Sequence, residues 1–433
     1  MTLVVLLVFF TVDAPFSDDY DAILAYIVRP FPERLLHLAD FHNEHRIVTA
    51  RIVFEAVYWI FGCINFRACM GVGAVFLLGY GLLLSSVFKQ IWAFAKWYYI
   101  PCVWMVVSTL NNDNVCWAMT SVSNVPVLFW TFCSIMAFAQ RKTVKCKWLS
   151  VATAVVCAIL ATFSTGAGMF VWFGLLFVQL HEWLIDKGSW SNAWKSRRGI
   201  GELFTTEFAV VSSMCVICVS AYLHGMYGAS LKEPPNIVNM ALFFLSFMGA
   251  IIPVFSISIA IGLLFLCVMV VIVVILPRNS NIIATAFLLC LVLCVGAATP
   301  FRSFAVDSAL VGRYRIIPVS IAVMLLASLL PYFRFLPRKS HVICSLVFSG
   351  VVIVYLVMFS FVSLRRLADR NEIVLRAMMT WTKDTVSIIH EKDNGERFSL
   401  LLKEAYKKGV YSPGSLIKPE WQNRIPWSAE NPK

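Results

Sequence analysis

The chain has 433 residues, of which 60% are hydrophobic and only 14% charged, with a formal net charge of +12. A soluble protein of this composition would expose far more hydrocarbon than its polar surface could cover, so the soluble classes are excluded. Because the basic residues lie between apolar runs of about 20 residues, we expect an all-α polytopic transmembrane helical bundle among membrane lipids, with no nucleic-acid partner.

The first apolar run, residues 1–12, is too short to cross a membrane. It lacks the basic start and the small-residue cleavage site of a signal peptide, so we interpret it as a short first membrane helix. Residues 239–252 precede Pro253 directly, which favours a re-entrant or interfacial segment over a full span. Further spans are expected at 68–88, 97–110, 117–139, 149–164, 168–185, 205–223, 255–276, 281–299, 316–333 and 341–363, about 11 crossings in all.

Lysine and arginine indicate which loops stay in the cytoplasm. Three loops carry clusters of them: "QRKTVKCKW", "DKGSWSNAWKSRRG" and "RFLPRKS". An N-terminus inside the cell places all three in the cytoplasm, whereas a full span at 239–252 would move "RFLPRKS" outside. The first outer loop (13–67), the loop "TLNNDN" and the loop 300–315 then lie outside. The chain divides into a transmembrane domain, 1–363, and a polar extracytoplasmic tail, 364–433, with an amphipathic helix expected before Gly409.

The stretch "DDYD" places Asp18 and Asp19 shortly after the first apolar run. Partial desolvation raises the pKa of a carboxyl group toward values that suit a proton acceptor. A general base for a hydroxyl nucleophile needs such a carboxylate within hydrogen-bond reach. Asp18 and Asp19 are therefore candidate bases. The alternative is that they only cap a helix and are solvated.

The stretch "HNEHR" contains His42, Glu44, His45 and Arg46. If residues 40–55 are helical, His42 and Arg46 share one face of an amphipathic helix at the membrane interface. The spacing is not the H-E-x-x-H of zinc proteases. We favour contacts to phosphate and sugar groups over a metal site. A solvated polar face is the alternative.

The outer loop 300–315 carries Arg302 and ends in "GRYR", which includes Arg313 and Tyr314. A guanidinium group can donate two parallel hydrogen bonds to a phosphate, so Arg313 is a candidate phosphate ligand. The alternative is an interfacial anchor formed by Tyr314 and its arginines. Basic residues on the side where they are normally scarce indicate an anionic partner.

The series "SDDYD", "HNEHRIV", "FSTGAGMFVW" and "GRYR" before a late span resembles bacterial members of the GT-C superfamily of polytopic glycosyltransferases. The likeness extends over most of the chain and includes the tail stretch "LLKEAYKKGVYSP". It implies that a sugar moves, with inversion, from a polyprenyl-phosphate carrier to a glycan or lipid acceptor of the cell envelope. The site would face the periplasmic side of the bacterial inner membrane.

Under this resemblance, Asp18 or Asp19 deprotonates the acceptor hydroxyl, and Arg313 with Arg302 neutralises the developing phosphate charge. The first-loop residues Arg46 and His42 position the donor. No metal ligand is assigned, and a divalent cation is left open because members of the superfamily differ in this respect.

Other classes of membrane protein also fit parts of the pattern. A lipid-linked oligosaccharide polymerase would place its chemistry in large late loops, whereas the richest loop here is the first. A flippase or transporter would place its ionisable residues at mid-membrane. A membrane partner without catalytic activity is the remaining alternative.

Overall fold

The structure is a computed structural model that describes residues 2–91, 96–187, 204–226, 236–272, 281–333, 337–380 and 395–412. Within these ranges the regular structure is helical except for two strands of two residues each, β1 (Phe41–His42) and β2 (His45–Arg46). The expected all-α fold is therefore confirmed. The basic loop around Lys195 and the final residues of the tail, 413–433, lie outside the described residues.

Long apolar helices form most of the molecule. In the described ranges, seven helical segments are long and apolar enough to cross a membrane, and three shorter apolar helices accompany them. The long segments are built on α5 (Phe66–Ile91), α7 (Ala118–Gln140), α9 (Val171–Lys187), α12 (Thr206–Leu223), α15 (Ile282–Arg302), α16 (Ile316–Leu329) and α17 (Arg338–Thr380). The shorter helices are α8 (Lys147–Thr162), α13 (Ile237–Met248) and α14 (Phe255–Val270).

The chain is thus a helical membrane protein, while the number of crossings stays a prediction. The run expected to span at 97–110 forms α6 (Lys96–Val106), which has 11 residues and contains Pro101. The first apolar run forms α1 (Thr2–Val5) and the helical segment η1 (Leu6–Phe10). At about 1.5 Å per residue, neither run is long enough to cross the hydrocarbon core alone.

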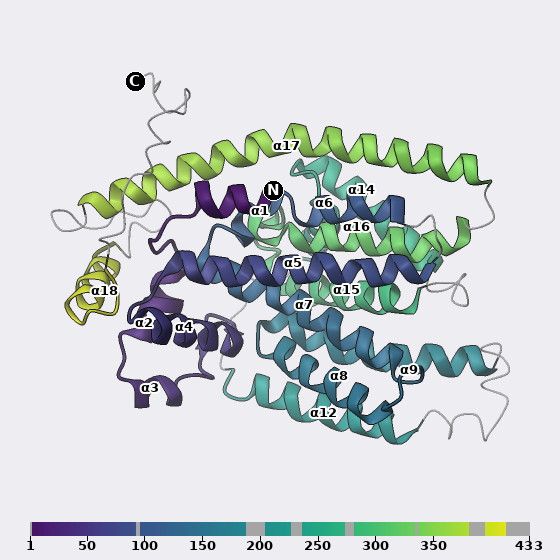
Figure 1. Cartoon of the computed structure of the whole chain (residues 1–433), viewed down its shortest axis with the longest axis horizontal. Helices are drawn as coiled ribbons and strands as arrows, with labels where there is room; N and C mark the ends of the chain where they lie inside the picture. The colour runs from purple at the N-terminus through teal and green to yellow at the C-terminus, as the bar shows by residue number, and fades with distance from the viewer. Residues whose placement is uncertain are drawn as a thin grey trace.

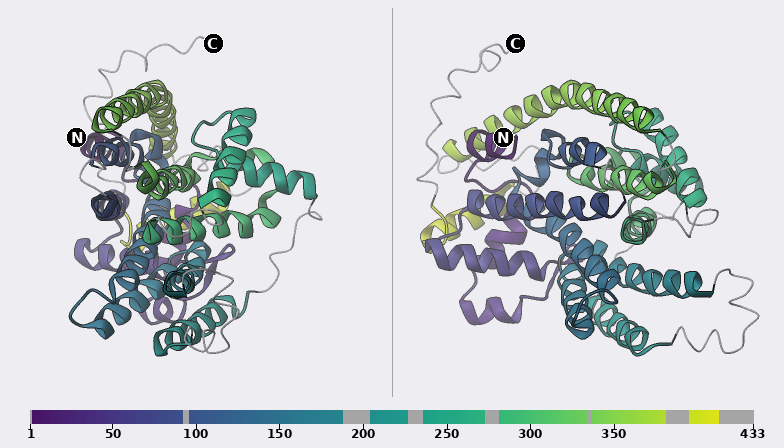
Figure 2. Two further views of the ribbon diagram at one scale, coloured as in Figure 1. Left: turned by 90° about the vertical axis from the view of Figure 1, so that its right-hand side faces the viewer. Right: turned by 45° about the vertical axis from the view of Figure 1, so that its right-hand side comes forward.

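The bundle has a buried centre and one helix on its outside. The most apolar windows of α7, α15 and the α16 segment are each 61% buried, whereas that of α17 is only 11% buried. Figure 1 shows α17 running along one side of the molecule, and Figure 2 shows the same helix at the periphery from two further directions. A helix that is apolar on every side and so little covered by protein is suited to contact with lipid.

The helices α13 and α14 form a tightly packed pair. A Cβ atom on Gly249 would lie 2.0 Å from the carbonyl oxygen of Ser258, and one on Gly262 would lie 1.9 Å from that of Leu245. Small residues of this kind let helix backbones approach closely in membranes. With only 12 residues, α13 is shorter than a full span, which agrees with a re-entrant or interfacial role for residues 239–252.

The first loop and the tail pack together at one end of the bundle. Figure 1 shows α2 (Ala25–Ile27), α3 (Phe31–Leu36) and α4 (Val48–Phe61) grouped there with α18 (Gly395–Lys407). Apolar residues of the first loop, the end of α17 and α18 share a second hydrophobic core, separate from that of the bundle. The amphipathic helix expected before Gly409 is confirmed by α18, and Gly409 has the positive φ of +69° common after a helix end.

The helix α17 continues through residue 363, where the sequence suggested that the last span ends. Its 43 residues correspond to about 65 Å, roughly twice the thickness of the hydrocarbon core. The first part of the expected tail is therefore an extension of this helix. It reaches the same end of the bundle as the first loop.

The two ends of the bundle give a test of the expected orientation. The helix α7 begins beside the first loop and ends at Gln140 after 23 residues in all, so the exposed Cys146 and the loop residue Asp307 lie at opposite ends. We expect a membrane-impermeant maleimide to label an Asp307→Cys variant in intact cells, and Cys146 only after the membrane is opened. The measurement is gel-shift labelling, with Cys146→Ser as the blank for position 146 and the natural chain, which keeps Cys63 and its other cysteines, as the blank for position 307. Labelling of both positions in intact cells would contradict the orientation.

Candidate functional site

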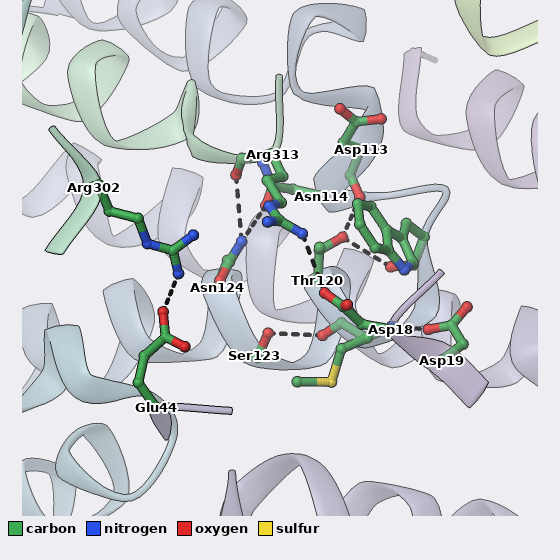
Figure 3. A network of polar contacts seen from close by, with 12 residues as sticks. Asp18, Asp19, Glu44, Asp113, Asn114, Thr120, Ser123, Asn124, Arg302 and Arg313 are labelled. Carbon is green, nitrogen blue, oxygen red and sulfur yellow. Dashed lines mark hydrogen bonds and ion pairs between the residues drawn. The ribbon is translucent and has the colours of Figure 1, made fainter. Parts of the chain in front are cut away.

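Polar side chains from distant parts of the sequence meet at the first-loop end of the bundle (Figure 3). Ion pairs join the first loop to α15 and to the turn η7 (Gly312–Tyr314). We call this group the polar cluster, and its members are Asp18, Glu44, Asp113, Asn114, Asn124, Arg302 and Arg313.

A tight turn sends the two neighbouring aspartates in different directions. Ser17 has a φ of +48°, a conformation that non-glycine residues seldom adopt, and the amide of Asp19 donates to the carbonyl of Phe16 at 3.0 Å. Figure 3 shows Asp18 directed toward Arg313 and Asp19 directed away from it. The turn therefore assigns one carboxylate to the polar cluster and the other to the protein interior.

Asp19 is fully buried and holds the first loop against the bundle. Its two carboxylate oxygens accept hydrogen bonds from the amide of Phe16 at 3.0 Å and from the amide of Met119 at 2.8 Å. Met119 lies in the first turn of α7, where unpaired amides favour a carboxylate. Burial raises the pKa of Asp19 to about 7, while the two amide hydrogen bonds oppose this shift.

Asp18 is the aspartate that faces the cluster. Its carboxylate accepts a hydrogen bond from Nη1 of Arg313 at 3.1 Å, and its side chain is 30% exposed. The guanidinium of Arg313 also lies over the rings of Trp117 and Tyr314, 5.3 and 5.1 Å from their centroids. Cation–π contacts of this kind fix the position of a guanidinium while its charge stays available.

A short hairpin carries Glu44 into the cluster. Residues 41–46 form β1 and β2, with His42 opposite His45 and Asn43 in the turn at a φ of +51°. Asparagine tolerates this conformation, which explains the turn. The expectation of a helix over 40–55 is therefore wrong for its first part, and α4 begins at Val48.

The hairpin is connected to α15 by an ion pair between Glu44 and Arg302. Burial acts to raise the pKa of Glu44, but Arg302, His45 and hydrogen bonds to the carboxylate together outweigh burial and hold that pKa below its usual value. The histidines His42 and His45 are largely buried, and burial lowers the pKa of each. Both are therefore neutral imidazoles near pH 7, able to donate one hydrogen bond and accept another.

Arg46 does not face the cluster. Its Nε donates to the carbonyl of Tyr222 at 2.8 Å, its terminal nitrogens donate to the carbonyls of Ala39 and His224, and it lies over the ring of Phe41. These contacts join the hairpin to the end of α12.

Two further first-loop arginines serve the fold in the same way. Arg51 donates to the carbonyls of His37, Leu38 and Asp40, and Arg34 pairs with Glu55 at 2.7 Å. Arg34, Arg46 and Arg51 thus have partners within the chain, although basic residues in an outer loop were expected to indicate an anionic partner.

A cavity of about 570 Å³ is lined in part by Arg313. Its walls come from the first loop, the segment around Asp113, the segment around Gly312 and the extension of α17. Four arginines line it: Arg313, Arg315, Arg366 and Arg370. Two acids, Asp113 and Asp369, also line it, so the lining charges sum to 4 − 2 = +2.

Asp113 and Gly312 set one wall of the cavity. Nη1 of Arg370 donates to Asp113 at 2.9 Å, and Nη2 donates to the carbonyl of Cys116 at 2.8 Å. A Cβ atom on Gly312 would lie 2.4 Å from the other carboxylate oxygen of Asp113. Glycine at the start of "GRYR" therefore lets this carboxylate approach the backbone.

The arginines on α17 were missed by sequence reasoning. Arg366 and Arg370 were grouped with a polar tail because they follow the last apolar run. Their i, i+4 spacing, which places both on one face of a continuing helix, was the available signal.

No protein-family model matches the chain, and no curated protein and no solved structure matches it. The GT-C resemblance therefore rests on the short motifs alone. Within the described residues, no three His, Cys, Asp or Glu side chains are grouped as ligands for a metal ion. The divalent cation stays an open prediction.

The buried Asp19 predicts a specific dependence of stability on pH. Because burial raises its pKa from 3.8 to about 7, the protonated carboxyl stabilises the folded state fully below pH 3.8. This contribution is lost as the pH rises through about 7. We expect Asp19→Asn, which cannot ionise, to show a smaller fall in Tm over this range than the natural chain. Thermal unfolding of the purified protein measures this, with Asp307→Asn, at an exposed position, as control. Equal slopes for both variants would contradict it.

Proposed function

We propose that the chain is a membrane glycosyltransferase that moves a sugar from a polyprenyl-phosphate carrier to an acceptor hydroxyl, with Asp18 as the general base. The observation that carries the proposal is the position of Asp18 beside Arg313, which itself lines the arginine-rich cavity. A proton acceptor and an anion-binding group within 3.1 Å of each other meet the two needs of glycosyl transfer from a phosphate.

The cavity suits the phosphate and the first part of a lipid chain. Its net lining charge of +2 attracts an anion, and its four arginines carry the guanidinium groups that pair well with phosphate, although Arg370 and Arg313 already donate to Asp113 and Asp18. Apolar side chains of the α17 extension, including Ile373, Val374 and Met378, line another part of the same cavity. The same helix, α17, has a surface suited to contact with lipid. A polyprenyl chain that lies along this surface would therefore reach the cavity from the membrane without crossing water.

In the proposed reaction, the acceptor hydroxyl gives its proton to Asp18 as its oxygen attacks the anomeric carbon. The bond between that carbon and the phosphate oxygen breaks, and polyprenyl phosphate leaves with the bonding electron pair. Arg313 stabilises the charge that develops on the leaving oxygen, where preorganised charges act most strongly. The acceptor must enter beside the Asp18–Arg313 pair, because Asp18 holds its proton-accepting oxygens there.

The remaining cluster residues are proposed to hold the donor sugar. Neutral His42 and His45, with Glu44 and Arg302, offer donors and acceptors of the kind that sugar hydroxyls require. Tyr314 lies beside Arg313 and supports its position. Arg46 is assigned to the fold of the hairpin.

The location of the charges supports this proposal over a flippase or transporter. A transport pathway requires ionisable groups near the bilayer midplane. The polar cluster and the cavity instead lie at one end of the helices, where α7 begins and α15 ends.

Replacement of the proposed base tests the chemistry. We expect Asp18→Asn to lower transfer from a polyprenyl-phosphate sugar by about 100-fold or more, because a positioned general base contributes at least that much. The measurement is transfer of radiolabelled sugar in membranes with matched expression. The exposed first-loop variant Asp40→Asn is the control. Normal transfer by Asp18→Asn would remove Asp18 from the chemistry.

The cavity arginines give a separate test. In Arg370→Gln the net lining charge falls to 3 − 2 = +1, so we expect a donor KM raised roughly tenfold with a smaller change in kcat. Steady-state kinetics at varied donor concentration measures this. Arg376→Gln is the matched control, because Arg376 lies on the same helix with a side chain 72% exposed. An unchanged KM for Arg370→Gln would contradict a phosphate role for the cavity.

A further inference from the structure

The described part of the tail, residues 395–412, is packed against the first loop. Its apolar residues Phe398, Leu402 and Tyr411 are almost fully buried in the second hydrophobic core. Lys408 donates to the carbonyl of Val28 at 3.2 Å. The carbonyl of Val410 accepts from the amide of Ile64 at 2.8 Å. We call residues 395–412 the strap, because they contact the first loop near both of its ends.

The strap holds the chain on both sides of Asp18. Before it, the hydroxyl of Tyr411 donates to the carbonyl of Asp13 at 2.9 Å. After it, the ring of Phe398 stacks on Tyr20, with centroids 4.5 Å apart. Close by, Arg397 pairs with Asp21 at 2.6 Å. The strap does not contact Asp18 itself, so its effect on this carboxylate passes through the backbone of residues 13–21.

The turn between these two attachments is one that needs external support. Ser17 has a positive φ, and non-glycine residues keep this conformation only where surrounding contacts impose it. Asp19 supplies one such contact, from α7. The ring of Phe16 adds contacts with Trp117 and Arg370. The strap supplies further contacts on both sides of the turn, from the opposite end of the chain.

We propose that the strap positions the site: its docking fixes the turn that directs Asp18 toward Arg313, and Phe398 and Tyr411 are its positioning residues. The catalytic part of this inference rests on the proposed function, while the docking itself does not. Release of the strap leaves the bundle and the cavity arginines in place but lets Asp18 leave Arg313. The strap is thus a means by which the C-terminal segment controls the reaction.

The test compares Phe398→Ala with Leu400→Ala, since Leu400 lies on the same helix and is 67% exposed. Hydrogen–deuterium exchange of the purified full chain is followed in residues 13–28 and, as internal reference, in α15. We expect Phe398→Ala to speed exchange in 13–28 at least tenfold and to leave α15 unchanged. Its kcat should fall on the order of 100-fold with donor KM little changed, because displacement of a reacting group has effects of that size. Leu400→Ala should match the natural chain, and Phe398→Met should restore most of the activity by filling the space.

The outcomes separate the two proposals. Unchanged exchange in 13–28 of Phe398→Ala would overturn the strap, whatever the activity. Faster exchange with undiminished kcat would overturn its positioning role. If exchange is faster in Phe398→Ala but neither the natural chain nor any variant transfers sugar, the result supports the docking of the strap and counts against the proposed function. If Phe398→Ala fails to fold, Tyr411→Phe takes its place, because this change removes only the hydrogen bond to Asp13. We expect exchange in 13–28 to rise several-fold in Tyr411→Phe. Unchanged exchange in this variant would contradict the strap.

Discussion

A buried carboxylate joins the first loop to the bundle. Asp19 accepts amide hydrogen bonds from its own turn and from the first turn of α7, so a loop that precedes the long helices is fixed to the helix at their centre. An unpaired buried charge is costly, and the raised pKa of Asp19 reflects that cost. The position of Asp18 follows from this contact, because the two residues are neighbours on one tight turn. The contact between Asp18 and Arg313 therefore depends on that turn.

The arginines of the first loop and those of the cavity differ in the groups with which they pair. Arg46 and Arg51 donate hydrogen bonds to backbone carbonyls, and Arg34 pairs with a glutamate. These three arginines therefore stabilise the first loop. Four arginines and two acids line the cavity, so arginine is in excess there even though Arg370 bonds to Asp113 and Arg313 to Asp18. Such a surplus suits an anionic ligand, because the planar fork of a guanidinium group matches phosphate and carboxylate. The proposed reaction uses this surplus.

Much of the bundle could be predicted because apolar runs are long and bounded by polar residues. The expected span at 68–88 lies within α5, and those at 117–139 and 281–299 begin one residue before α7 and α15 and otherwise lie within them. The GT-C resemblance implies one site for Arg313 and either Asp18 or Asp19, and the structure brings Asp18 into contact with Arg313, 295 residues away. What could not be predicted depends on tertiary contacts. Two adjacent aspartates look alike until a turn buries one of them, and a polar stretch such as 40–47 has no periodicity that separates hairpin from helix.

The pairing of the two chain ends has a consequence for biosynthesis. Tyr411 bonds to Asp13 across 398 residues, so the first loop is synthesised long before its partner. Until then the face of Tyr20 that Phe398 covers stays open. Contacts of such high sequence separation form late in folding. A nascent chain therefore contains the helices of the bundle before it contains the strap, and a product that stops short of residue 395 would lack the contacts that we propose to fix the turn at Asp18.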